Sequence, residues 1–411
     1  MLQTDTQSII DRHDQFMSLN YARFPIAMVN GEGCRLRDAD GKDYIDLFAG
    51  FGATILGHCH RDLVAALTEQ AGRLWHVGNL LHTEPQTRVA EAIAKHGFGG
   101  RSFFCHSGAD ANEAAIKLAR LYGKTKPGPR GQRFKVISTT RSFHGRTFGT
   151  MPATGEPAVR LGFGPMVPGF NTVPYNDRTA VETQIDDETV AILVEPIQGE
   201  GGVIVPDESY FRSLREVCDE HDLLLICDEV WTGCGRTGRY FGYQHWGVEP
   251  DIMTLGKGVG GGMAVGVMCA KHEVAAMYDA RQQGGVKHAS TLGGNCLGMA
   301  VAATIFDVLE RDDLIAHADH LGAVAMNRLR AMTPSCPAIS NVRGRGLFIA
   351  IELDLPSARY KQVSQIVDRC LQGGILVNGT QQTVLRLAPP LVIDKQTLEE
   401  GLNVLQEVLS G

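Results

Sequence analysis

The central part of the chain alternates short apolar runs with amphipathic helical patterns, and this alternation limits the possible folds more than any other feature. Helical patterns at residues 111–122 and 210–221 separate some of these runs. Strands that alternate with helices are typical of a largely parallel sheet covered by helices, so the sequence predicts an α/β fold. The predicted strands are residues 103–105, 134–138, 190–194, 223–227, 252–255 and 265–269.

Both ends of the chain follow a different pattern, in which strands are further apart. A chain of 411 residues is longer than one ordinary core accommodates. We therefore predict a large domain over residues 61–300 and a smaller α+β domain formed by residues 1–60 with 301–411. The elements expected in the smaller domain are helices at 297–310, 315–332 and from Lys395, with strands at 33–37, 44–47, 346–353 and 384–387.

Charge and apolar content exclude several classes of protein. The net charge of −7 argues against nucleic acid or an anionic membrane as a partner. No apolar run approaches the length of about 18 residues that spans a bilayer, and the polar residues 1–16 do not resemble a signal peptide. The ten scattered cysteines, without a CxxC pair, favour reduced thiols in a cytoplasmic protein. His58-Cys59-His60 is read as a loop, because adjacent side chains rarely point at one ion, and no metal site is predicted.

Lys257 lies among glycines directly after an apolar stretch, in the segment TLGKGVGGG at residues 254–262. Glycines let other groups approach the backbone closely, which suits a lysine whose amine forms a Schiff base with a carbonyl. Asp228 follows the apolar run at 223–227, and open α/β sheets bind ligands at the carboxyl ends of their strands. A Schiff-base lysine together with a carboxylate for a pyridinium nitrogen is the pair that pyridoxal phosphate requires.

Three further motifs follow predicted strands. Ser107 suits the N-cap of the next helix, and Gly108 lets the first N–H groups of that helix meet an anion, which favours a phosphate site over a merely capped helix. Phe143 offers a flat face to an aromatic cofactor, and Arg146 offers a fork for a carboxylate. The third motif contains two acids, Glu195 and Glu200, among glycines at the end of a predicted strand. This position favours an active-site role for them over a role as turn caps.

Residues 256–261 also match GxGxxG, the pattern of dinucleotide-binding proteins. The residues that follow are predicted to form a strand rather than the required helix, and no strand-ending acid occurs about 20 residues later. A dehydrogenase is therefore the weaker alternative. An inactive homologue is disfavoured because Lys257 and Asp228 are both present.

Taken together, these motifs resemble the class III aminotransferases, which are pyridoxal-phosphate enzymes of fold type I, and most closely the acetylornithine and ornithine aminotransferases. The resemblance extends from residues 21–25 to residues 385–389, with the motifs in the family's order. It implies a large domain with a mostly parallel sheet and a smaller α+β domain. It also implies transfer of an ω-amino group to 2-oxoglutarate.

The resemblance assigns roles around the cofactor. Lys257 would attach pyridoxal phosphate and move the substrate proton, while Asp228 would keep the pyridine nitrogen protonated. Ser290 and Thr291 would reach the phosphate in the partner subunit, which implies a homodimer. The other implied cofactor contacts are Ser107, Gly108 and Ala109 at the phosphate, Phe143 and Val230 on the ring faces, and His144, Glu195 and Trp231.

The resemblance also assigns substrate contacts. Arg146 would hold the outer carboxylate and Arg386 the α-carboxylate of 2-oxoglutarate. Glu200 would cover Arg386 while the distal amine of the donor reacts. Tyr21 and Phe51 would face the substrate.

Some positions depart from the family's pattern. Trp231 stands where a glutamine that bonds the cofactor is usual, and Phe51 stands where ornithine aminotransferases carry tyrosine, which favours an acetylornithine-type donor. Ornithine, succinylornithine and 4-aminobutyrate stay open as donors. An aminomutase or a decarboxylating enzyme on the same scaffold also stays open. The other departures are His106, Asp110, Leu292 and Cys296.

Overall fold

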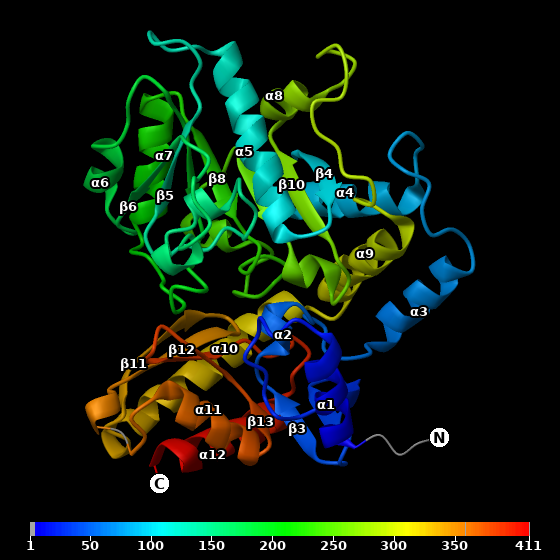
Figure 1. The fold of residues 1–411 in the computed structure, drawn as a ribbon, viewed down its shortest axis with the longest axis vertical. Helices are drawn as coiled ribbons and strands as arrows, with labels where there is room; N and C mark the ends of the chain where they lie inside the picture. The colour runs from blue at the N-terminus through cyan, green and yellow to red at the C-terminus, as the bar shows by residue number, and fades with distance from the viewer. Residues whose placement is uncertain (1–4, 358, 411) are drawn as a thin grey trace.

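The computed structural model describes residues 5–357 and 359–410. Residues 1–4, 358 and 411, all in the predicted small domain, lie outside the described part. Figure 1 shows one large sheet with its helices in the upper part of the view and smaller sheets with theirs below. The two ends of the described chain lie in the lower part, so the chain starts there, builds the upper part and returns.

The large sheet has seven strands in the order β4-β10-β9-β8-β7-β5-β6. Its neighbours pair in parallel except at β10, which runs antiparallel to both β4 and β9. The predicted mostly parallel sheet is therefore confirmed. Its strands are β4 (Arg101–Cys105), β5 (Lys135–Thr139), β6 (Phe170–Val173), β7 (Thr189–Val194), β8 (Leu224–Asp228), β9 (Ile252–Leu255) and β10 (Gly266–Ala270).

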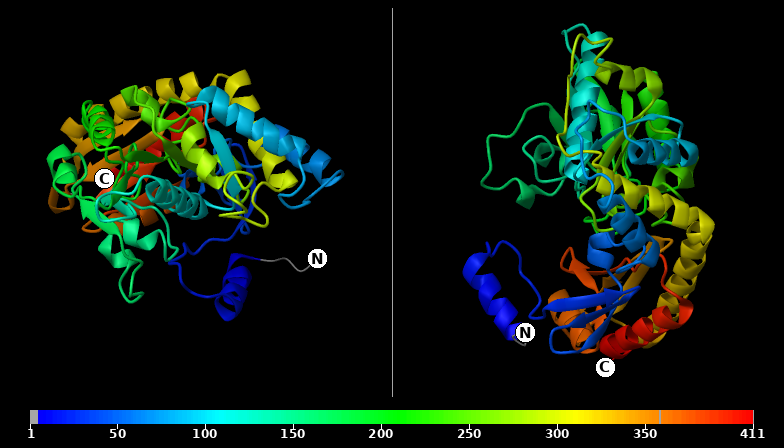
Figure 2. Two further views of the ribbon diagram at one scale, coloured as in Figure 1. Left: turned by 90° about the horizontal axis from the view of Figure 1, so that it is seen from above. Right: turned by 90° about the vertical axis from the view of Figure 1, so that its right-hand side faces the viewer.

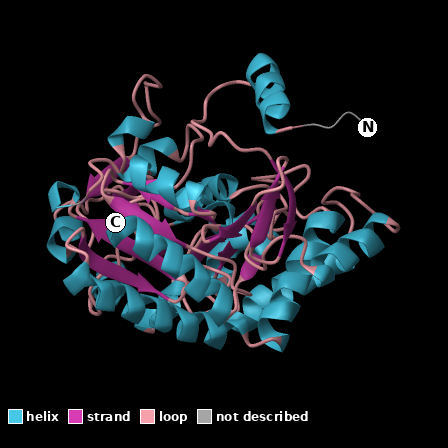
Figure 3. Cartoon of the chain, turned by 90° about the horizontal axis from the view of Figure 1, so that it is seen from below, coloured by secondary structure: helices cyan, strands magenta, loops and turns pink. Residues whose placement is uncertain are grey.

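The central strands are apolar on both faces because helices cover both. In β8, Leu224 and Ile226 join one hydrophobic core, and the alternating Leu225 and Cys227 join the other. Helix α5 packs across β7, β9 and β10, and α7 packs on β8. Figure 3 shows helices surrounding the strands. The helices of this part are α3 (Arg61–Ala71), α4 (Glu84–His96), α5 (Gly108–Thr125), α6 (Arg178–Glu182), α7 (Tyr210–Glu220) and α8 (His272–Ala275).

Two four-stranded sheets form the lower part, in the orders β1-β2-β3-β13 and β11-β12-β15-β14. In the first sheet β13 pairs in parallel with β3, which joins the two ends of the chain. The domain boundaries at residues 60 and 300 stay predictions. The strands are β1 (Met28–Glu32), β2 (Arg35–Asp38), β3 (Asp43–Asp46), β11 (Ile339–Arg345), β12 (Phe348–Leu353), β13 (Ile375–Leu376), β14 (Asn378–Thr380) and β15 (Val384–Leu387).

Helices α10, α11 and α12 pack on these sheets, whereas α9 packs on α3 and α4 of the upper part. Figure 2 shows α1 standing apart from the sheets at the N-terminal end. Within the described chain, no helix combines the length and the apolar character needed to cross a membrane. The helices are α1 (Thr6–Phe16), α2 (Ala49–Gly52), α9 (Cys296–Arg311), α10 (Leu314–Met332), α11 (Val363–Gln372) and α12 (Lys395–Ser410).

The structure corrects the sequence prediction at several elements. Five strands were not predicted, since their burial is partial and their apolar patterns are short or weak: β1, β6, β11, β13 and β14. Gly33 and Gly346 were predicted as the first residues of strands 33–37 and 346–353, but both have positive φ values, of 54°, and lie in the connections between β1 and β2 and between β11 and β12. Glycine adopts this backbone conformation without a Cβ clash, so the chain reverses there instead of extending.

Candidate active site

A cavity of about 350 Å³ lies at the carboxyl end of the parallel strands. Strand β8 ends at Asp228, β9 ends two residues before Lys257, and β7 ends one residue before Glu195. The side chains that follow these strands therefore meet at one edge of the sheet. The predicted site residues that line the cavity are Ser107, Gly108, Ala109, Phe143, His144, Arg146, Glu195, Asp228, Val230, Trp231 and Lys257.

Asp228 is a buried carboxylate whose position is fixed by three neighbours. The Nδ2 of Asn112 donates to its Oδ2 at 2.7 Å, and the Nδ1 of His144 lies 2.7 Å from the same oxygen. The backbone N–H of Val230 donates to Oδ1 at 3.0 Å. These contacts fix the orientation of the carboxylate at the strand end, where it lines the cavity.

Lys257 is the first residue of the short helix η4 (Lys257–Gly260) and has a φ of 46°. A residue with a Cβ rarely adopts this backbone conformation, and such strain is common at functional sites. Its Nζ lies 3.7 Å from the centre of the Trp231 ring. Burial lowers the pKa of the amine to about 8, although Glu200, Glu195 and Asp228 act in the opposite direction. About a tenth of the amine is thus neutral, and therefore nucleophilic, at pH 7, far more than for a lysine with the ordinary pKa of 10.5.

The start of α5 forms another side of the cavity. The Oγ of Ser107 accepts a hydrogen bond from the Asp110 N–H at 3.2 Å, which confirms the predicted N-cap. The N–H groups of Gly108 and Ala109 belong to the first helical turn, where a helix offers them no internal acceptor. A Cβ on Gly108 would lie 2.6 Å from Val230, so glycine is required for the helix start to approach that side chain. This geometry can hold an anion.

Glu195 connects the motif after β7 with the motif after β5. Its Oε1 accepts from the Phe143 N–H at 2.9 Å, and its Oε2 accepts from the Gly199 N–H at 3.0 Å. Burial raises the pKa of this carboxyl to about 7. The contacts hold the half-buried Phe143 ring at the cavity wall.

Arg386 lies in β15 with its side chain almost completely buried. Its Nη1 donates to the Gly199 carbonyl at 2.9 Å and lies 3.2 Å from Oε2 of Glu200. Its Nε donates to Oδ1 of Asn378 at 2.9 Å, on the neighbouring strand β14. Arg386, predicted to bind a carboxylate, and Glu200, predicted to cover it, thus form an ion pair. Arg146, in contrast, is exposed, and its Cζ lies 5.6 Å from the centre of the Phe143 ring.

Six predicted residues do not line this cavity: Arg386 and Glu200, which form the ion pair described above, and four others. Tyr21 is exposed and lies in a separate hollow beside α1. Phe51 is half exposed, and its ring centre is 6.4 Å from that of Trp231. Ser290 contacts His106 at 3.3 Å from Oγ to Nδ1, and Thr291 is exposed.

The family profile of class-III aminotransferases matches residues 16–409. The chain belongs to the class III aminotransferases. It is 42% identical to the acetylornithine aminotransferase of Caldanaerobacter subterraneus subsp. tengcongensis over 98% of this chain and 99% of that protein. Among solved structures, ornithine aminotransferase from Toxoplasma gondii is similar with a TM-score of 0.92 and 32% identity, over 99% of this chain and 95% of that one. N-acetylornithine aminotransferase from Stenotrophomonas maltophilia is similar with a TM-score of 0.82 and 32% identity, over 98% of each chain.

This aminotransferase has fold type I, and its cofactor is pyridoxal phosphate. The cavity fits that group in four respects. Phe143 and Val230 offer apolar surfaces for a ring, and Asp228 offers a fixed carboxylate for its nitrogen. Lys257 offers an amine, and the start of α5 offers N–H donors for a phosphate.

Two residues of the site were not assigned from the sequence. Asn112 bonds Asp228 and also accepts from Thr254 at 2.8 Å, which ties α5 to the ends of β8 and β9. Asn378 holds Arg386 across the pairing of β14 and β15. Asn112 lies within the motif around Ser107, five residues after the N-cap, so its helical position gave a usable signal. Asn378 gave none, since its role depends on long-range strand register.

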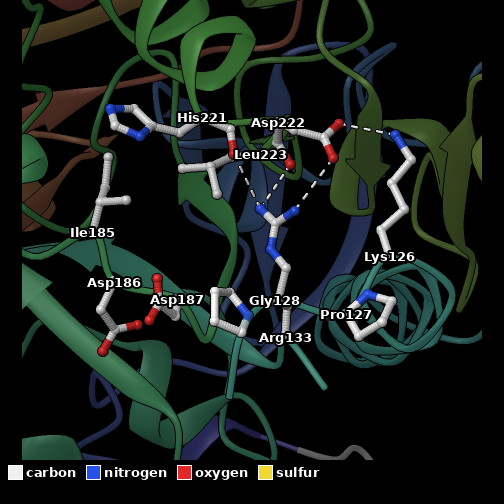
Figure 4. A pocket seen from close by; sticks show the side chains of 11 residues that line it. Lys126, Pro127, Gly128, Arg133, Ile185, Asp186, Asp187, His221, Asp222 and Leu223 are labelled. Carbon is white, nitrogen blue, oxygen red and sulfur yellow. Dashed lines mark hydrogen bonds and ion pairs between the residues drawn. The ribbon is translucent and has the colours of Figure 1, made fainter. Parts of the chain in front are cut away.

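Another hollow of the aminotransferase, of about 490 Å³, lies at the opposite edge of the large sheet (Figure 4). Its residues precede β5, β7 and β8, so it is at the amino ends of those strands. Its acidic side chains have ion-pair partners: Asp222 lies 2.9 Å from Lys126 and 3.3 Å from Arg133, while Asp186 and Asp187 pair with Lys135 and Arg130. This hollow therefore presents structural ion pairs, not the reactive groups of the active site.

Proposed function

We propose that this enzyme transfers the ω-amino group of N-acetylornithine to 2-oxoglutarate by a ping-pong mechanism, giving the semialdehyde and glutamate. The observation that carries the proposal is the difference between the two arginines. Arg386 is paired with Glu200 at 3.2 Å, while Arg146 is exposed at the cavity and has no acidic partner among the described residues. One carboxylate site is thus open and the other is closed by a movable acid.

The two half-reactions differ in the number of carboxylates near the reacting carbon. The α-carboxylate of N-acetylornithine would bind Arg146 and leave its distal amine free to reach the site of Lys257. Glu200 would stay on Arg386 during this step. 2-Oxoglutarate carries two carboxylates, so it would bind both arginines after Glu200 moves aside. Bidentate, charge-assisted hydrogen bonds make arginine suited to both contacts.

Pyridoxal phosphate, when bound, supplies an electron sink for the carbanion that is left when the substrate carbon loses a proton. Lys257 is proposed to remove and return that proton, a task that requires an amine with a lowered pKa. Asp228 is proposed to hold the proton on the ring nitrogen. Phe143 and Val230 would orient the ring, and the start of α5 would anchor the phosphate.

The proposed donor is supported by the 42% identical relative, whose name is acetylornithine aminotransferase, and by Phe51. We also propose a homodimer, in which exposed Thr291 reaches the partner subunit. The cytoplasm is the proposed location, supported by ten unpaired cysteines.

The test is a panel of amino donors with 2-oxoglutarate, with glutamate as the measured product. N-acetylornithine should give the highest kcat/KM among N-acetylornithine, succinylornithine, ornithine and 4-aminobutyrate, without release of CO2. A higher kcat/KM for another ω-amine would replace the proposed donor. Release of CO2, or absence of glutamate with every donor, would contradict the reaction class proposed here.

A further inference from the structure

Trp231 lies against two cations of the active site. Its ring centre is 3.7 Å from Nζ of Lys257 and 4.6 Å from Cζ of Arg386. The indole is 5% exposed and forms part of the cavity wall together with Lys257. Neither Arg386 nor Glu200 lines that cavity. The ring therefore stands at the boundary between the reactive amine and the buried guanidinium.

Two glycines pack closely against opposite edges of the indole. A Cβ on Gly52 would lie 2.5 Å from Nε1, and a Cβ on Gly199 would lie 2.4 Å from Cε3. Both distances are far below a normal contact, so each glycine is needed to accommodate this ring. The Phe348 ring packs on it with centres 5.1 Å apart, and the Phe48 ring lies at 6.4 Å. Because packed interiors resist displacement, the indole is a fixed wall.

The buried Nε1 of Trp231 has no hydrogen-bond partner in the part of the chain that the structure describes. An unpaired buried donor costs free energy, so this tryptophan is not explained by its own bonding. Its contacts with Lys257 and Arg386 are cation–π contacts, in which the ring face attracts a positive charge. The indole thus occupies space at the reacting centre.

We infer that Trp231 is a specificity-determining residue, whose indole disfavours α-amino acids as amino donors by occupying space beside both Lys257 and Arg386. The inference rests on the proposed function and refines its substrate class. In an α-amino acid the amine and the carboxylate are on one carbon, so a donor held by Arg386 must place that carbon beside the indole. The α-carbon of 2-oxoglutarate must take the same place, so the indole slows both directions of this half-reaction relative to the ω-amine half-reaction. The terminal carbon of an ω-amine carries only hydrogens and its chain, and it needs less room there.

This selection by volume differs from the proposed selection by charge. Glu200 has a partly exposed side chain and is proposed to move away from Arg386. Trp231 is confined by Gly52 and Gly199 and cannot move aside in the same way. The two residues therefore act on the same competitor by independent means. Shape-based pockets discriminate substrates by about 10- to 200-fold for small differences in size, which sets the scale of the expected effect.

The first experiment compares Trp231→Gln and Trp231→Phe with the parent holoenzyme. Single-turnover rates are measured separately for glutamate and for N-acetylornithine. The ratio of the glutamate rate to the N-acetylornithine rate should rise about 10-fold or more in Trp231→Gln and less in Trp231→Phe, which retains an aromatic face. Trp246→Phe is the matched control, because it removes a buried indole that stacks on Phe211 away from the cavity, and it should leave the ratio unchanged.

The second experiment measures binding without turnover. Glutarate has the two carboxylates of 2-oxoglutarate but neither a carbonyl nor an amine, so it reports on access to both arginines. Calorimetry should show a Kd for glutarate at least about threefold lower in Trp231→Gln than in the parent enzyme. An unchanged rate ratio, or an unchanged Kd in a folded Trp231→Gln variant, would overturn the inference.

A double-mutant cycle tests the packing itself. Gly52 has a φ of 77°, so Gly52→Ala introduces the same backbone strain whichever residue is at position 231. The loss of Tm caused by Gly52→Ala should be smaller in Trp231→Gln than in the parent chain, because the Cβ no longer meets the indole. Equal losses would show that the ring is not confined as inferred.

The experiments distinguish a wrong choice of amino donor from a wrong role for Trp231. If the parent enzyme does not use N-acetylornithine, the proposed donor is wrong, and the ratio is formed with the ω-amine that the parent enzyme does use. A rise of that ratio in Trp231→Gln supports the role of Trp231. No rise contradicts it.

Discussion

Nη1 of Arg386 lies 3.2 Å from Oε2 of Glu200, and the two residues come from segments that are 186 positions apart. The guanidinium is buried, whereas the carboxylate side chain is 32% exposed. A buried charge needs a partner, but this partner can move into solvent without leaving Arg386 unbonded, since Gly199 and Asn378 still accept from it. The pair is suited to a gate that opens for a second carboxylate.

Glu200→Ala should expose Arg386 and accelerate the half-reaction with glutamate. We expect the rate with glutamate, relative to that with N-acetylornithine, to increase roughly 10-fold, as when about 1.4 kcal/mol of competition for the guanidinium is removed. The N-acetylornithine half-reaction should be unchanged or slower. Single-turnover spectroscopy of each half-reaction measures the ratio. Glu208→Ala is the control, because Glu208 pairs with Arg345 outside the cavity; an unchanged ratio in Glu200→Ala would exclude the gate.

Incorporation of pyridoxal phosphate into the apoenzyme should depend on the ionisation of Lys257. An amine attacks a carbonyl only in its neutral form, and burial lowers the pKa of this amine from 10.5 to about 8. The rate should therefore rise with pH and level off above about pH 8, as followed by the absorbance of the bound cofactor.

Glu200→Gln should shift the pH dependence of cofactor incorporation in a defined direction. The negative charge of Glu200 raises the pKa of Lys257, so its removal should shift the rate profile to lower pH. A midpoint near 10 in the parent enzyme, or a shift to higher pH in Glu200→Gln, would contradict the assignment of Lys257 as the titrating group.

Asp228→Asn should retain the fold and bind pyridoxal phosphate but lose most of the activity. The amide still fills the space beside Asn112 and His144, but it lacks the charge that holds the ring nitrogen protonated. We expect kcat to fall at least about 100-fold, the scale of one preorganised electrostatic group. Cofactor content by absorbance and kcat are measured together. A rate close to that of the parent enzyme would make Asp228 a structural residue.

The sequence was sufficient to bring Lys257, Asp228 and Glu195 to one place, for a physical reason. Each follows a parallel strand, and the carboxyl ends of parallel strands share one edge of the sheet. Chain order alone therefore predicts that these side chains are neighbours. The N-cap at Ser107 was equally predictable, because it depends on only four consecutive residues, 107–110.

Other parts of the site depend on contacts that no local pattern encodes. Asn378 faces Arg386 only because β14 and β15 pair in one particular register. The sequence shows that tryptophan replaces the usual glutamine at position 231. It does not show how the indole is accommodated, because this depends on Gly52, which is distant in sequence. The antiparallel direction of β10 likewise follows from tertiary pairing and not from its own apolar pattern.

Mixed dimers should show whether Thr291 serves the site of the partner subunit. Lys257→Ala and Thr291→Arg should each be inactive, the second because a bulky cation would block the phosphate contact. If each site combines Lys257 of one chain with Thr291 of the other, a hybrid dimer has one intact site. Random mixing after unfolding and refolding should then restore about a quarter of the parent activity. No recovery in folded dimers would place Thr291 in the site of its own chain or outside it.

Arg146→Ala tests whether the donor carries a carboxylate. The side chain is exposed at the cavity, over Phe143, and is proposed to bind a carboxylate of each substrate. Loss of hydrogen bonds to a charged group costs about 1.5–3 kcal/mol, so KM should rise roughly 10- to 100-fold for N-acetylornithine and for 2-oxoglutarate alike. Arg146→Lys should be intermediate, since lysine keeps the charge but loses the bidentate fork. Arg141→Ala, in the same loop and also exposed, is the control and should leave both KM values unchanged. If Arg146→Ala raises KM for 2-oxoglutarate but spares the donor half-reaction, the donor has no α-carboxylate at this position, and a simple ω-amine replaces N-acetylornithine as the proposed substrate.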